Sequence, residues 1–462
     1  MAKAIMFCGT ASGVGKSIIT TAFCRILANK GYSVAPFKSQ NMSLNSITTP
    51  DGFEISIAQN LQATAARVMP DWRMNPILLK PDGGKTYIVR KGKPFKTVSY
   101  GEYYKFADEH FEIAKDAFDS LSREFDFIVM EGAGSPAEIN LQKYDIVNLR
   151  MAGYAKANVY IVGDIDKGGV FAAFKGTFDL IKDKFKPLVK GFIINKFRGD
   201  INLLKPAFDM FKNYCSVPIL GVVPFVRLKL DEEDSLFKPS KKEGFVKICV
   251  IKLPYMSNFT DFGVFEFIDD VSLKFIDKPE FDDCDMVIIP GSKAVDYDLN
   301  YLYKAGFYEA LCKILSKKLL IGVCGGYQML GEVVGLSKGF GFLKMTTEFS
   351  KDKKLINKTY KGINYLKGAN LEGYEIHHGL SEVEGVIQLA EDSNVCVFEE
   401  SKKIIGTYLH GIFNNREFLK FIFNVIGKKI DVNIDIAKEK DKQIDMLAEI
   451  IENSLPVDKM IQ

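Results

Sequence analysis

Residues 9–17 read GTASGVGKS, and this stretch decides the fold expected for the N-terminal half of the chain. It follows the apolar run AIMFC (4–8), which has the character of a buried strand, and precedes a helical pattern from about Gly15 to Asn29. Glycines allow backbone N–H groups to surround phosphate oxygens, and the start of a helix adds partial positive charge. The order of strand, glycine-rich loop and helix therefore predicts a phosphate-binding loop.

The side chains at the end of this loop are those that a nucleoside triphosphate and its metal ion require. Lys16 can reach the β- and γ-phosphates, and the Ser17 hydroxyl can ligate Mg²⁺. In the strict pattern the first glycine would occupy position 10, but this residue is threonine and the glycine stands one position earlier. The predicted ATP-binding residues are Gly9, Thr10, Gly13, Gly15, Lys16 and Ser17.

This longer loop separates two classes of nucleotide-binding protein. Partition and septum-site ATPases carry a signature lysine where this chain has Ala11, so the sequence disfavours a nucleotide-driven switch of that kind. The longer form resembles the loop of dethiobiotin synthetase and its relatives, which phosphorylate a carboxylate. The loop therefore favours an enzyme that transfers a phosphoryl group.

Short apolar runs recur along the first half of the chain. Their continuous rather than alternating character is typical of parallel strands that are covered by helices on both faces. After the run SVAPFK (33–38), they lie at 125–132, 158–165, 190–196 and 218–225. The pattern predicts an α/β fold over residues 1–230: a doubly wound, dethiobiotin synthetase-like domain with a phosphate loop.

Acidic and polar side chains stand where ligands bind in such a fold. Glu131 ends the strand FDFIVME, and ligands bind at the carboxyl ends of strands in open α/β sheets, so this carboxylate is a candidate Mg²⁺ ligand beside Ser17. Asp51 is a second candidate metal ligand, and Glu54 a further acidic candidate. A polar cluster after the second strand predicts a polar substrate, bound by Lys38, Gln40, Asn41 and Asn45.

A charged stretch, LDEEDSLFKPSKKEG (230–244), interrupts the strand pattern and resembles an interdomain linker. A second series of apolar runs follows it, at 246–254, 285–292, 318–326 and 395–411, the last with the pattern of a hairpin. We therefore expect a linker over 231–245, a second α/β domain over 246–435 and a C-terminal tail over 436–462.

The second half contains a cysteine in a tight turn between a strand and a helix. Residues 322–328 read GVCGGYQ, after the apolar run LLI and before a helical pattern, which is the arrangement of a nucleophile elbow. The start of the helix stabilises a thiolate at Cys324. The GxCxGxQ pattern is typical of class I glutamine amidotransferases, so we predict a glutaminase with Cys324 as its nucleophile. The residues expected at the oxyanion and the glutamine are Gly291, Gly325 and Gln328.

A thiol nucleophile requires a base, and the chain has four histidines, at positions 110, 377, 378 and 410. His410, in GTYLHGIF at the end of a strand in the same half, is the best candidate. In most class I amidotransferases a glutamate two residues later orients the histidine, but this position is Ile412. The sequence therefore predicts a Cys–His dyad without a local orienting acid. His377 fits either a site-lining or a packed position, and His110 is expected at the surface.

With both halves considered, the chain resembles the cobyrinic and cobyric acid synthase family of amidotransferases, which act in cobalamin biosynthesis. The resemblance runs from the phosphate loop to about residue 425. The segments that go beyond a generic amidotransferase are NMSLNS (41–46), MNPILLKP (74–81) and SNFTDF (257–262). This family also lacks the glutamate after the histidine, so Ile412 agrees with the resemblance.

The resemblance implies a ligase that uses ATP and glutamine to amidate the b, d, e and g carboxylates of adenosylcobyrinic acid a,c-diamide, which gives adenosylcobyric acid. It implies that Lys16 and Ser17 bind ATP–Mg²⁺, that Cys324 is the glutaminase nucleophile and that His410 is its base. Two alternatives stay open. One is the sister activity, cobyrinic acid a,c-diamide synthase, and the other is a nucleotide-dependent switch with a glutamine-sensing module.

Composition limits the expected partners and location. The chain has 61 basic and 58 acidic side chains, a balance that gives no reason to expect nucleic acid or a membrane surface as a partner. No apolar stretch approaches the roughly 18 residues that would span a bilayer. The eight cysteines are scattered without a CxxC pair, which argues against a zinc site or a disulfide framework. We expect a cytoplasmic enzyme with a small corrinoid substrate; the oligomeric state is not predicted.

Overall fold

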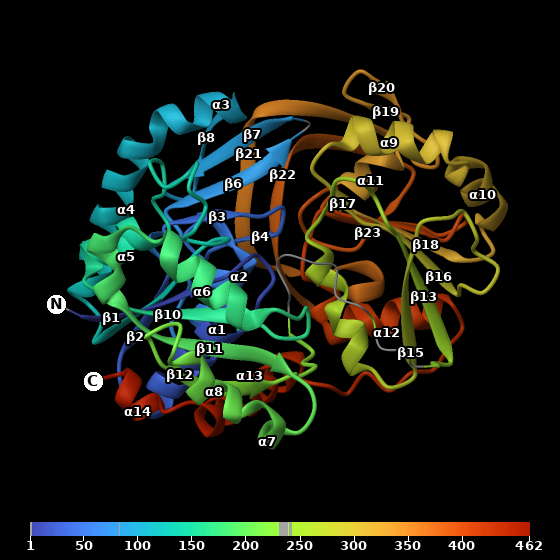
Figure 1. The fold of residues 1–462 in the computed structure, drawn as a ribbon. Helices are drawn as coiled ribbons and strands as arrows, with labels where there is room; N and C mark the ends of the chain where they lie inside the picture. The colour runs from blue at the N-terminus through green and yellow to red at the C-terminus, as the bar shows by residue number, and fades with distance from the viewer. Residues whose placement is uncertain (1, 83, 231–238, 240–242) are drawn as a thin grey trace. The chain divides into compact units, whose positions relative to one another are not determined.

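The computed structural model describes residues 2–82, 84–230, 239 and 243–462, which divide into two compact units (Figure 1). The first unit comprises Met1–Ser43, Ile55–Leu230 and Lys440–Gln462, and the second comprises Leu44–Glu54 and Asp231–Glu439. Most of the linker predicted for 231–245 lies outside the described residues. Each unit therefore contains one short segment that comes from the far end of the sequence.

The first unit is built on a six-stranded sheet in which every neighbouring pair is parallel. Its order is β12 (Ile219–Pro224), β11 (Val189–Phe197), β10 (Asn158–Asp164), β1 (Lys3–Gly9), β9 (Phe127–Glu131) and β2 (Val34–Phe37). The chain runs from central β1 to the edge at β2, returns to β9 and then builds outward on the other side. This order confirms the doubly wound α/β prediction, and it places the phosphate loop at the switch point beside β1.

Helices cover both faces of this sheet, which explains the continuous apolar runs. Met6 and Cys8 of β1 lie in one core, with Phe118 of helix α4 (Ala107–Ser122). Ile5 and Phe7 lie in the opposite core. Helix α1 (Lys16–Asn29) packs in that second core, while α5 (Leu149–Ala155) and α6 (Val170–Leu180) pack in the first. Because both faces are buried, neither face of a strand needs polar residues.

Smaller elements complete the first unit. A four-stranded sheet has the order β3 (Gln40–Met42), β6 (Ile77–Asp82), β7 (Lys85–Arg90) and β8 (Lys93–Ser99). The remaining α-helices described in this unit before its C-terminal segment are α2 (Ile57–Ala65), α3 (Tyr100–Tyr103), α7 (Ile201–Leu204) and α8 (Pro206–Phe211).

The C-terminal segment, which the sequence analysis treats as a tail, is helical and belongs to the first unit from Lys440 onward. It forms α13 (Ile436–Ser454) and α14 (Val457–Met460), which lie beside the strands and helices of the first unit in Figure 1. Leu447 and Ile451 of α13 are buried in the same core as Phe23 of α1. This segment is therefore part of the folded nucleotide-binding unit.

The second unit has its own sheet of seven strands, ordered β15 (Val271–Ile276), β13 (Val246–Ile251), β16 (Met286–Ile289), β18 (Leu319–Val323), β25 (Ile404–Thr407), β24 (Cys396–Glu399) and β23 (Ile387–Gln388). The first five are parallel, and the β24–β25 hairpin is antiparallel, as the sequence predicts for 395–411. Its described α-helices are α9 (Val295–Lys304), α10 (Phe307–Ile314), α11 (Gly325–Met329) and α12 (Arg416–Val425).

A second sheet of this unit has no counterpart in the sequence analysis. The long strands β21 (Lys344–Lys361) and β22 (Asn370–Glu384) pair antiparallel, with β19 (Val333–Val334) and β20 (Ser337–Lys338) at one side. Strand β14 (Met256–Ser257) pairs with β17 (Gly291–Ser292). The inserted segment Leu44–Glu54 contains β4 (Ser46–Thr48) and the first residue of β5 (Glu54–Ser56).

The cysteines differ from the sequence prediction in one respect. Cys249 of β13 and Cys284, before β16, form a disulfide with an S–S distance of 1.97 Å. Their strands are neighbours in the sheet, so residues 35 positions apart in sequence are adjacent in space. The scattered spacing hides this pairing, because only the sheet order brings the two thiols together.

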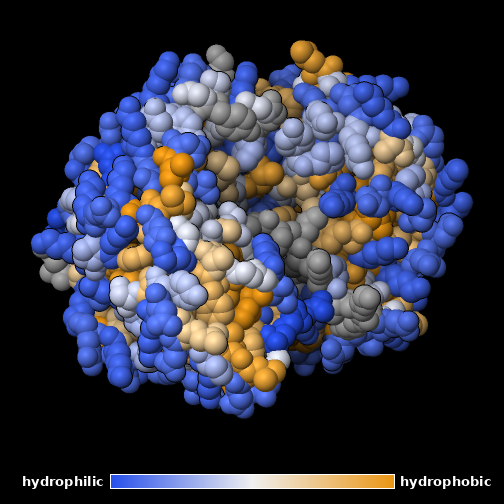
Figure 2. Space-filling view, viewed as in Figure 1, coloured by the Kyte–Doolittle hydropathy of each residue, from blue (hydrophilic) through white to orange (hydrophobic). Residues whose placement is uncertain are grey.

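The surface shown in Figure 2 is mostly hydrophilic, in agreement with a chain in which 26% of the residues are charged. Within the part of the chain that the structure describes, no helix combines the length and apolar character needed to cross a membrane.

Candidate active sites

The phosphate loop connects β1 to α1 in a conformation that requires glycine. Gly15 has φ 99°, and a Cβ atom at this residue would lie 2.1 Å from the side-chain nitrogen of Asn195. The Lys16 side chain is buried and folds back along the loop, where its Nζ donates to the carbonyl oxygens of Ala11 (3.0 Å) and Gly134 (3.3 Å). Its ammonium group therefore lies between two backbone carbonyl oxygens, one of the loop itself and one of the segment after β9.

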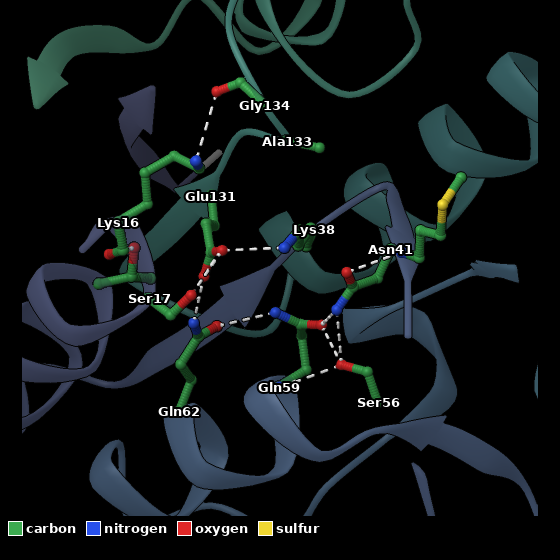
Figure 3. A network of polar contacts seen from close by, with 12 residues as sticks. Lys16, Ser17, Lys38, Asn41, Ser56, Gln59, Gln62, Glu131, Ala133 and Gly134 are labelled. Carbon is green, nitrogen blue, oxygen red and sulfur yellow. Dashed lines mark hydrogen bonds and ion pairs between the residues drawn. The ribbon is translucent and has the colours of Figure 1, made fainter. Parts of the chain in front are cut away.

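Glu131 is the centre of the polar network beside this loop (Figure 3). It ends β9, is 1% exposed and accepts hydrogen bonds from Ser17 Oγ (2.9 Å) and Lys38 Nζ (2.9 Å). Gln62 Nε2 of α2 donates to its other oxygen at 2.6 Å. Burial raises the pKa of Glu131, but the charge of Lys38, its hydrogen bond and the charge of Lys16 outweigh this effect and lower the pKa. Glu131 is therefore an ionised carboxylate.

Ser17 and Glu131 present a hydroxyl oxygen and a carboxylate oxygen at one point, and hard cations prefer such ligands. These two residues fit a Mg²⁺ ion. Asp51 does not join them in the contacts of the described residues: it belongs to the second unit and is exposed at the turn before Gly52. Asp51 as a metal ligand therefore stays a prediction from the sequence.

The predicted polar cluster divides between the two units. Lys38 pairs with Glu131, and Asn41 donates to Ser56 Oγ and Gln59 Oε1, both at 2.9 Å. Gln40 is hydrogen-bonded to the Tyr103 hydroxyl. Asn45 is buried in the second unit, two residues into the inserted segment.

In the second unit, Cys324 occupies the sharp turn between β18 and α11 with φ 51° and ψ −108°. Its Sγ lies 3.8 Å from the carbonyl oxygen of Ile376 on β22. A Cβ at Gly326 would lie 2.1 Å from the Ile289 carbonyl oxygen, so the turn accepts only glycine there. This geometry confirms the expected strand–turn–helix arrangement around the thiol.

His410 is fully buried and its Nδ1 lies 2.7 Å from Oδ2 of Asp261, in 3₁₀ helix η4 (Phe259–Phe267). The second oxygen of Asp261 accepts from the Gly411 backbone N–H at 2.9 Å. Burial lowers the pKa of His410, but the charge and hydrogen bond of Asp261, with the nearby Cys324 thiol, raise it to about 10. The expected dyad therefore has an orienting acid, which comes from the SNFTDF motif and not from the residues after His410.

The loops after β16 and β18 meet beside these side chains. A Cβ at Gly325 would lie 2.8 Å from the backbone nitrogen of Ser292, and one at Gly291 would lie 3.4 Å from Cε1 of His410. The structure thus brings Gly291 and Gly325 together with Cys324 and His410. Backbone N–H groups at such a junction can stabilise an oxyanion next to the nucleophile.

Comparisons with known proteins find relatives of both halves of the chain. Residues 5–236 match the family model described as CobQ/CobB/MinD/ParA nucleotide binding domain, and residues 247–418 match that of the CobB/CobQ-like glutamine amidotransferase domain. The cobyric acid synthase of Clostridium botulinum (strain Okra / Type B1) is 44% identical, over 100% of this chain and 99% of that protein. The cobyric acid synthase of Thermoanaerobacter sp. (strain X514) is 41% identical, again over 100% and 99%. The chain belongs to the cobyric acid synthase family.

Within this member of the cobyric acid synthase family, several residues of the sites were not predicted as such. Ser56 caps the N-terminus of α2, and Gln59 and Gln62 follow it at intervals of three residues, so that all three lie on the face nearest Glu131 (Figure 3). The stretch EISIAQNLQA (54–63) contains this spacing, but spacing alone does not show which element the face meets. Asn195 and Lys196 hold the other side of the loop through the carbonyl oxygens of Val14 (2.8 Å) and Gly13 (2.6 Å).

The remaining glutaminase residues form a second buried network. Gln328 Nε2 donates to the Tyr408 hydroxyl at 3.2 Å, and the His377 ring stacks on Tyr408 at 3.9 Å. His377 Nε2 lies 2.9 Å from Glu375. Burial raises the pKa of Glu375, but hydrogen bonds from His377, Tyr360 and Lys354 lower it to about 2. His377 therefore packs on Tyr408, the residue that binds Gln328.

His110 corrects a prediction, because it is fully buried and not at the surface. It lies on α4, with its ring 5.6 Å from that of Tyr103 and 5.8 Å from that of Phe106. These aromatic partners come from the segment before the helix, and the sequence around His110 does not show that they cover it.

Proposed function

We propose that this chain catalyses the ATP- and glutamine-dependent amidation of the b, d, e and g carboxylates of adenosylcobyrinic acid a,c-diamide to adenosylcobyric acid. The observation that carries the proposal is the presence in one chain of a Cys324–His410–Asp261 constellation and a phosphate loop beside Glu131. Membership of the cobyric acid synthase family supports the choice of a corrinoid substrate. We extend the proposal to a cytoplasmic location and to a small corrinoid substrate, with neither nucleic acid nor a membrane as a partner.

In the first unit, the proposed reaction is phosphoryl transfer. Lys16 and the loop N–H groups bind the phosphates of ATP, and an oxygen of the substrate carboxylate attacks the γ-phosphorus. ADP leaves and an acyl phosphate forms. Ser17 and Glu131 are the residues that would hold Mg²⁺, which, when bound, neutralises negative charge on the phosphates. Lys38 keeps Glu131 ionised and so keeps this ligand available.

In the second unit, the proposed reaction is glutamine hydrolysis. The Cys324 thiolate attacks the side-chain amide carbon, and the backbone N–H groups at the Gly291–Gly325 junction stabilise the oxyanion. The protonated Nε2 of His410 gives its proton to the nitrogen that leaves as ammonia. Water, deprotonated by His410, then hydrolyses the thioester to glutamate and regenerates the thiol. Ammonia attacks the acyl phosphate, phosphate leaves, and the amide results.

The direct test is to incubate the protein with the a,c-diamide, ATP, Mg²⁺ and glutamine and to follow the product by mass spectrometry. We expect four successive replacements of a carboxyl OH by NH₂, each with one ADP and one glutamate. A preference for cobyrinic acid over the a,c-diamide would assign the sister activity instead. Nucleotide-dependent dimerisation without carboxylate-dependent ADP release would indicate a switch and contradict the proposal.

A further inference from the structure

The segment Leu44–Glu54 lies in the second unit, although the residues on both sides of it belong to the first. It forms a tight hairpin, closed by Thr49 N–H donating to Phe53 O (2.7 Å) and Gly52 N–H donating to Thr49 O (2.9 Å). We call these eleven residues the 44–54 segment. Its sequence, from the NMSLNS motif to the start of EISIAQNLQA, has no part in the reaction steps described above.

One side of the 44–54 segment holds the loop that carries the orienting acid of the glutaminase. The Ser46 backbone N–H donates to the side-chain oxygen of Asn258 at 3.0 Å. Asn258 has φ 52° and immediately precedes η4, and its carbonyl accepts from the Asp261 N–H at 3.1 Å. Asp261 is the acid bound to His410. Asn258 therefore links the 44–54 segment to Asp261, the partner of the catalytic base.

The other side of the 44–54 segment holds the strand behind the catalytic thiol. Thr48 Oγ1 donates to the backbone oxygen of Glu375 at 3.3 Å, and Thr48 O accepts from Asn357 Nδ2 at 2.6 Å. The residue after Glu375 is Ile376, whose carbonyl oxygen faces Cys324 Sγ. The segment thus contacts the immediate neighbours of both Cys324 and Asp261.

A buried ion pair fixes the end of the segment. Glu54 is fully buried and accepts from Lys353 Nζ of β21 at 2.6 Å and from Ser46 Oγ at 2.9 Å. The Lys353 side chain is 5% exposed, so both charges depend on each other for stabilisation. The pair ties the two ends of the hairpin to the sheet of the second unit.

The covalent ends of the segment lead to the phosphate site. On the N-terminal side the chain reaches Lys38, which binds Glu131, within six residues of Leu44. On the C-terminal side it continues directly into α2, whose Gln62 binds the other oxygen of Glu131. The Asn41, Gln59 and Gln62 side chains connect these two stretches in the first unit (Figure 3). Both ends of the segment are therefore continuous with residues that bind Glu131.

We propose that the 44–54 segment is a positioning element of the glutaminase: it aligns Asp261–His410 and the Ile376 carbonyl, and makes glutamine hydrolysis respond to nucleotide and carboxylate substrate at the other site. This inference rests on the proposed function. Its residues have no part in the reaction steps and act through Asn258 and Glu375. Coupling free energies of this kind are typically about 1–3 kcal/mol, which corresponds to about 5–150-fold.

The test compares Glu54→Gln and Thr48→Val with a matched control, Glu348→Gln, which changes an exposed carboxylate on the same strand as Lys353. Three rates are measured on the full chain: glutamine hydrolysis alone, glutamine hydrolysis with ATP and the a,c-diamide, and amidation driven by ammonium chloride. We expect the two segment variants to lower the stimulation of glutamine hydrolysis by about tenfold. Ammonia-driven amidation by the segment variants stays within twofold of the wild-type rate, as do all three rates of the control variant. A twofold change corresponds to about 0.4 kcal/mol.

A second pair of variants tests the contact to Asn258. Asn258→Gly keeps the positive φ but removes the oxygen that accepts from Ser46, whereas Asn258→Asp keeps an acceptor in the same place. We expect the glycine variant to lose stimulation and the aspartate variant to recover most of it, with an unchanged KM for glutamine. Unchanged stimulation in the segment variants, or an equal loss of ammonia-driven amidation, would overturn the inference. A wild type with nucleotide-stimulated glutaminase but no amide product would contradict the proposed function and leave this inference standing.

Discussion

At the scale of single residues, Asp261 joins two distant parts of the second unit. One of its oxygens binds His410 Nδ1 and the other binds the Gly411 N–H, so the carboxylate fixes both the ring and the backbone beside it. A carboxylate in this position holds the proton on Nδ1 and leaves Nε2 as the base. His410 is therefore oriented as well as activated by a residue that lies before the nucleophile in sequence.

Replacement of this acid gives the first prediction. Asp261→Asn removes the charge that favours the protonated ring, so the pKa of His410 falls from its raised value of about 10. Since the protonated ring is the acid that gives its proton to the leaving nitrogen, the alkaline limb of glutamine hydrolysis moves to lower pH. We expect kcat/KM for glutamine to fall on the order of 10–100-fold. The measurement is the pH profile of glutamate release, with ammonia-driven amidation as the unchanged control; an unaltered alkaline limb would contradict this role.

The sequence predicted the residues whose chemistry lies in consecutive positions. Lys16, Ser17 and Cys324 each stand at the start of a helix that follows a strand and a tight turn, and this local arrangement is the signal. Asp261 and Gln62 could not be identified in this way, because they reach His410 and Glu131 across 149 and 69 residues. Such contacts depend on how the strands are ordered, and spacing along the chain does not encode that order.

At the scale of elements, the sequence predicts the parallel strands of the two main sheets but not the long antiparallel strands. Continuous apolar runs marked the strands of both main sheets, because these strands are buried on both faces. Strand β21 reads KMTTEFSKDKKLINKTYK and contains no such run. Its pairing with β22 also shifts register between Phe349 and Lys354, which interrupts any alternation of polar and apolar residues. The pattern of apolar residues therefore could not predict β21.

Helix α4 supplies the second prediction, which concerns stability. Burial, with a smaller effect of Arg90, lowers the pKa of His110 to about 4, against 6.5 for an ordinary histidine. The folded protein therefore binds fewer protons than the unfolded chain between these values. The contribution of the neutral His110 ring to the free energy of unfolding is fully present above pH 6.5. It is lost as the pH falls toward 4, by up to about 3 kcal/mol.

His110→Leu removes this acid sensitivity and leaves an apolar side chain among Tyr103 and Phe106. We expect the variant to have a higher Tm than the wild type at pH 5 and a similar Tm at pH 8, where the ring is neutral in both states. Thermal unfolding at both pH values measures the difference, and the pH 8 comparison controls for packing. A Tm difference that does not change with pH would show that His110 is not buried as a neutral ring.

At the scale of the whole molecule, the chain passes between its two units four times, after residues 43, 54, 230 and 439. Only the passage near 230 was expected, because a charged, strand-free stretch marks it. The other passages lie in a polar loop after Ser43, inside β5 and inside α13, where composition does not change. Where the chain returns to a unit that it has left, the boundary can be recognised only from contacts between residues in the structure.

The return of α13 to the first unit gives the third prediction. The Arg25 side chain of α1 is fully buried, and its guanidinium is paired with Asp441 and Asp445 of α13. Asp441→Asn with Asp445→Asn leaves a buried cation without its counter-charges. We expect a loss of about 2 kcal/mol in the free energy of unfolding, below the 3–5 kcal/mol for fully buried pairs because the carboxylates are half exposed. Adding Arg25→Met should restore part of this stability in thermal unfolding, whereas a further loss would argue that the charge itself is not the cause.

The division into two sites leads to the fourth prediction. Cys324→Ser removes the thiolate but changes neither the phosphate loop nor Glu131, which belong to the other unit. Glutamine-driven amidation should therefore disappear, by at least about 10³-fold as for other lost nucleophiles, while ammonia-driven amidation stays near the wild-type rate. Lys16→Ala should abolish amidation from either nitrogen source, because the acyl phosphate no longer forms, yet it should leave basal glutamine hydrolysis intact. The measurement is amide formation with glutamine or ammonium chloride in each variant. If Cys324→Ser kept glutaminase activity, glutamine hydrolysis would not depend on this thiol, and Cys324 would not be the nucleophile.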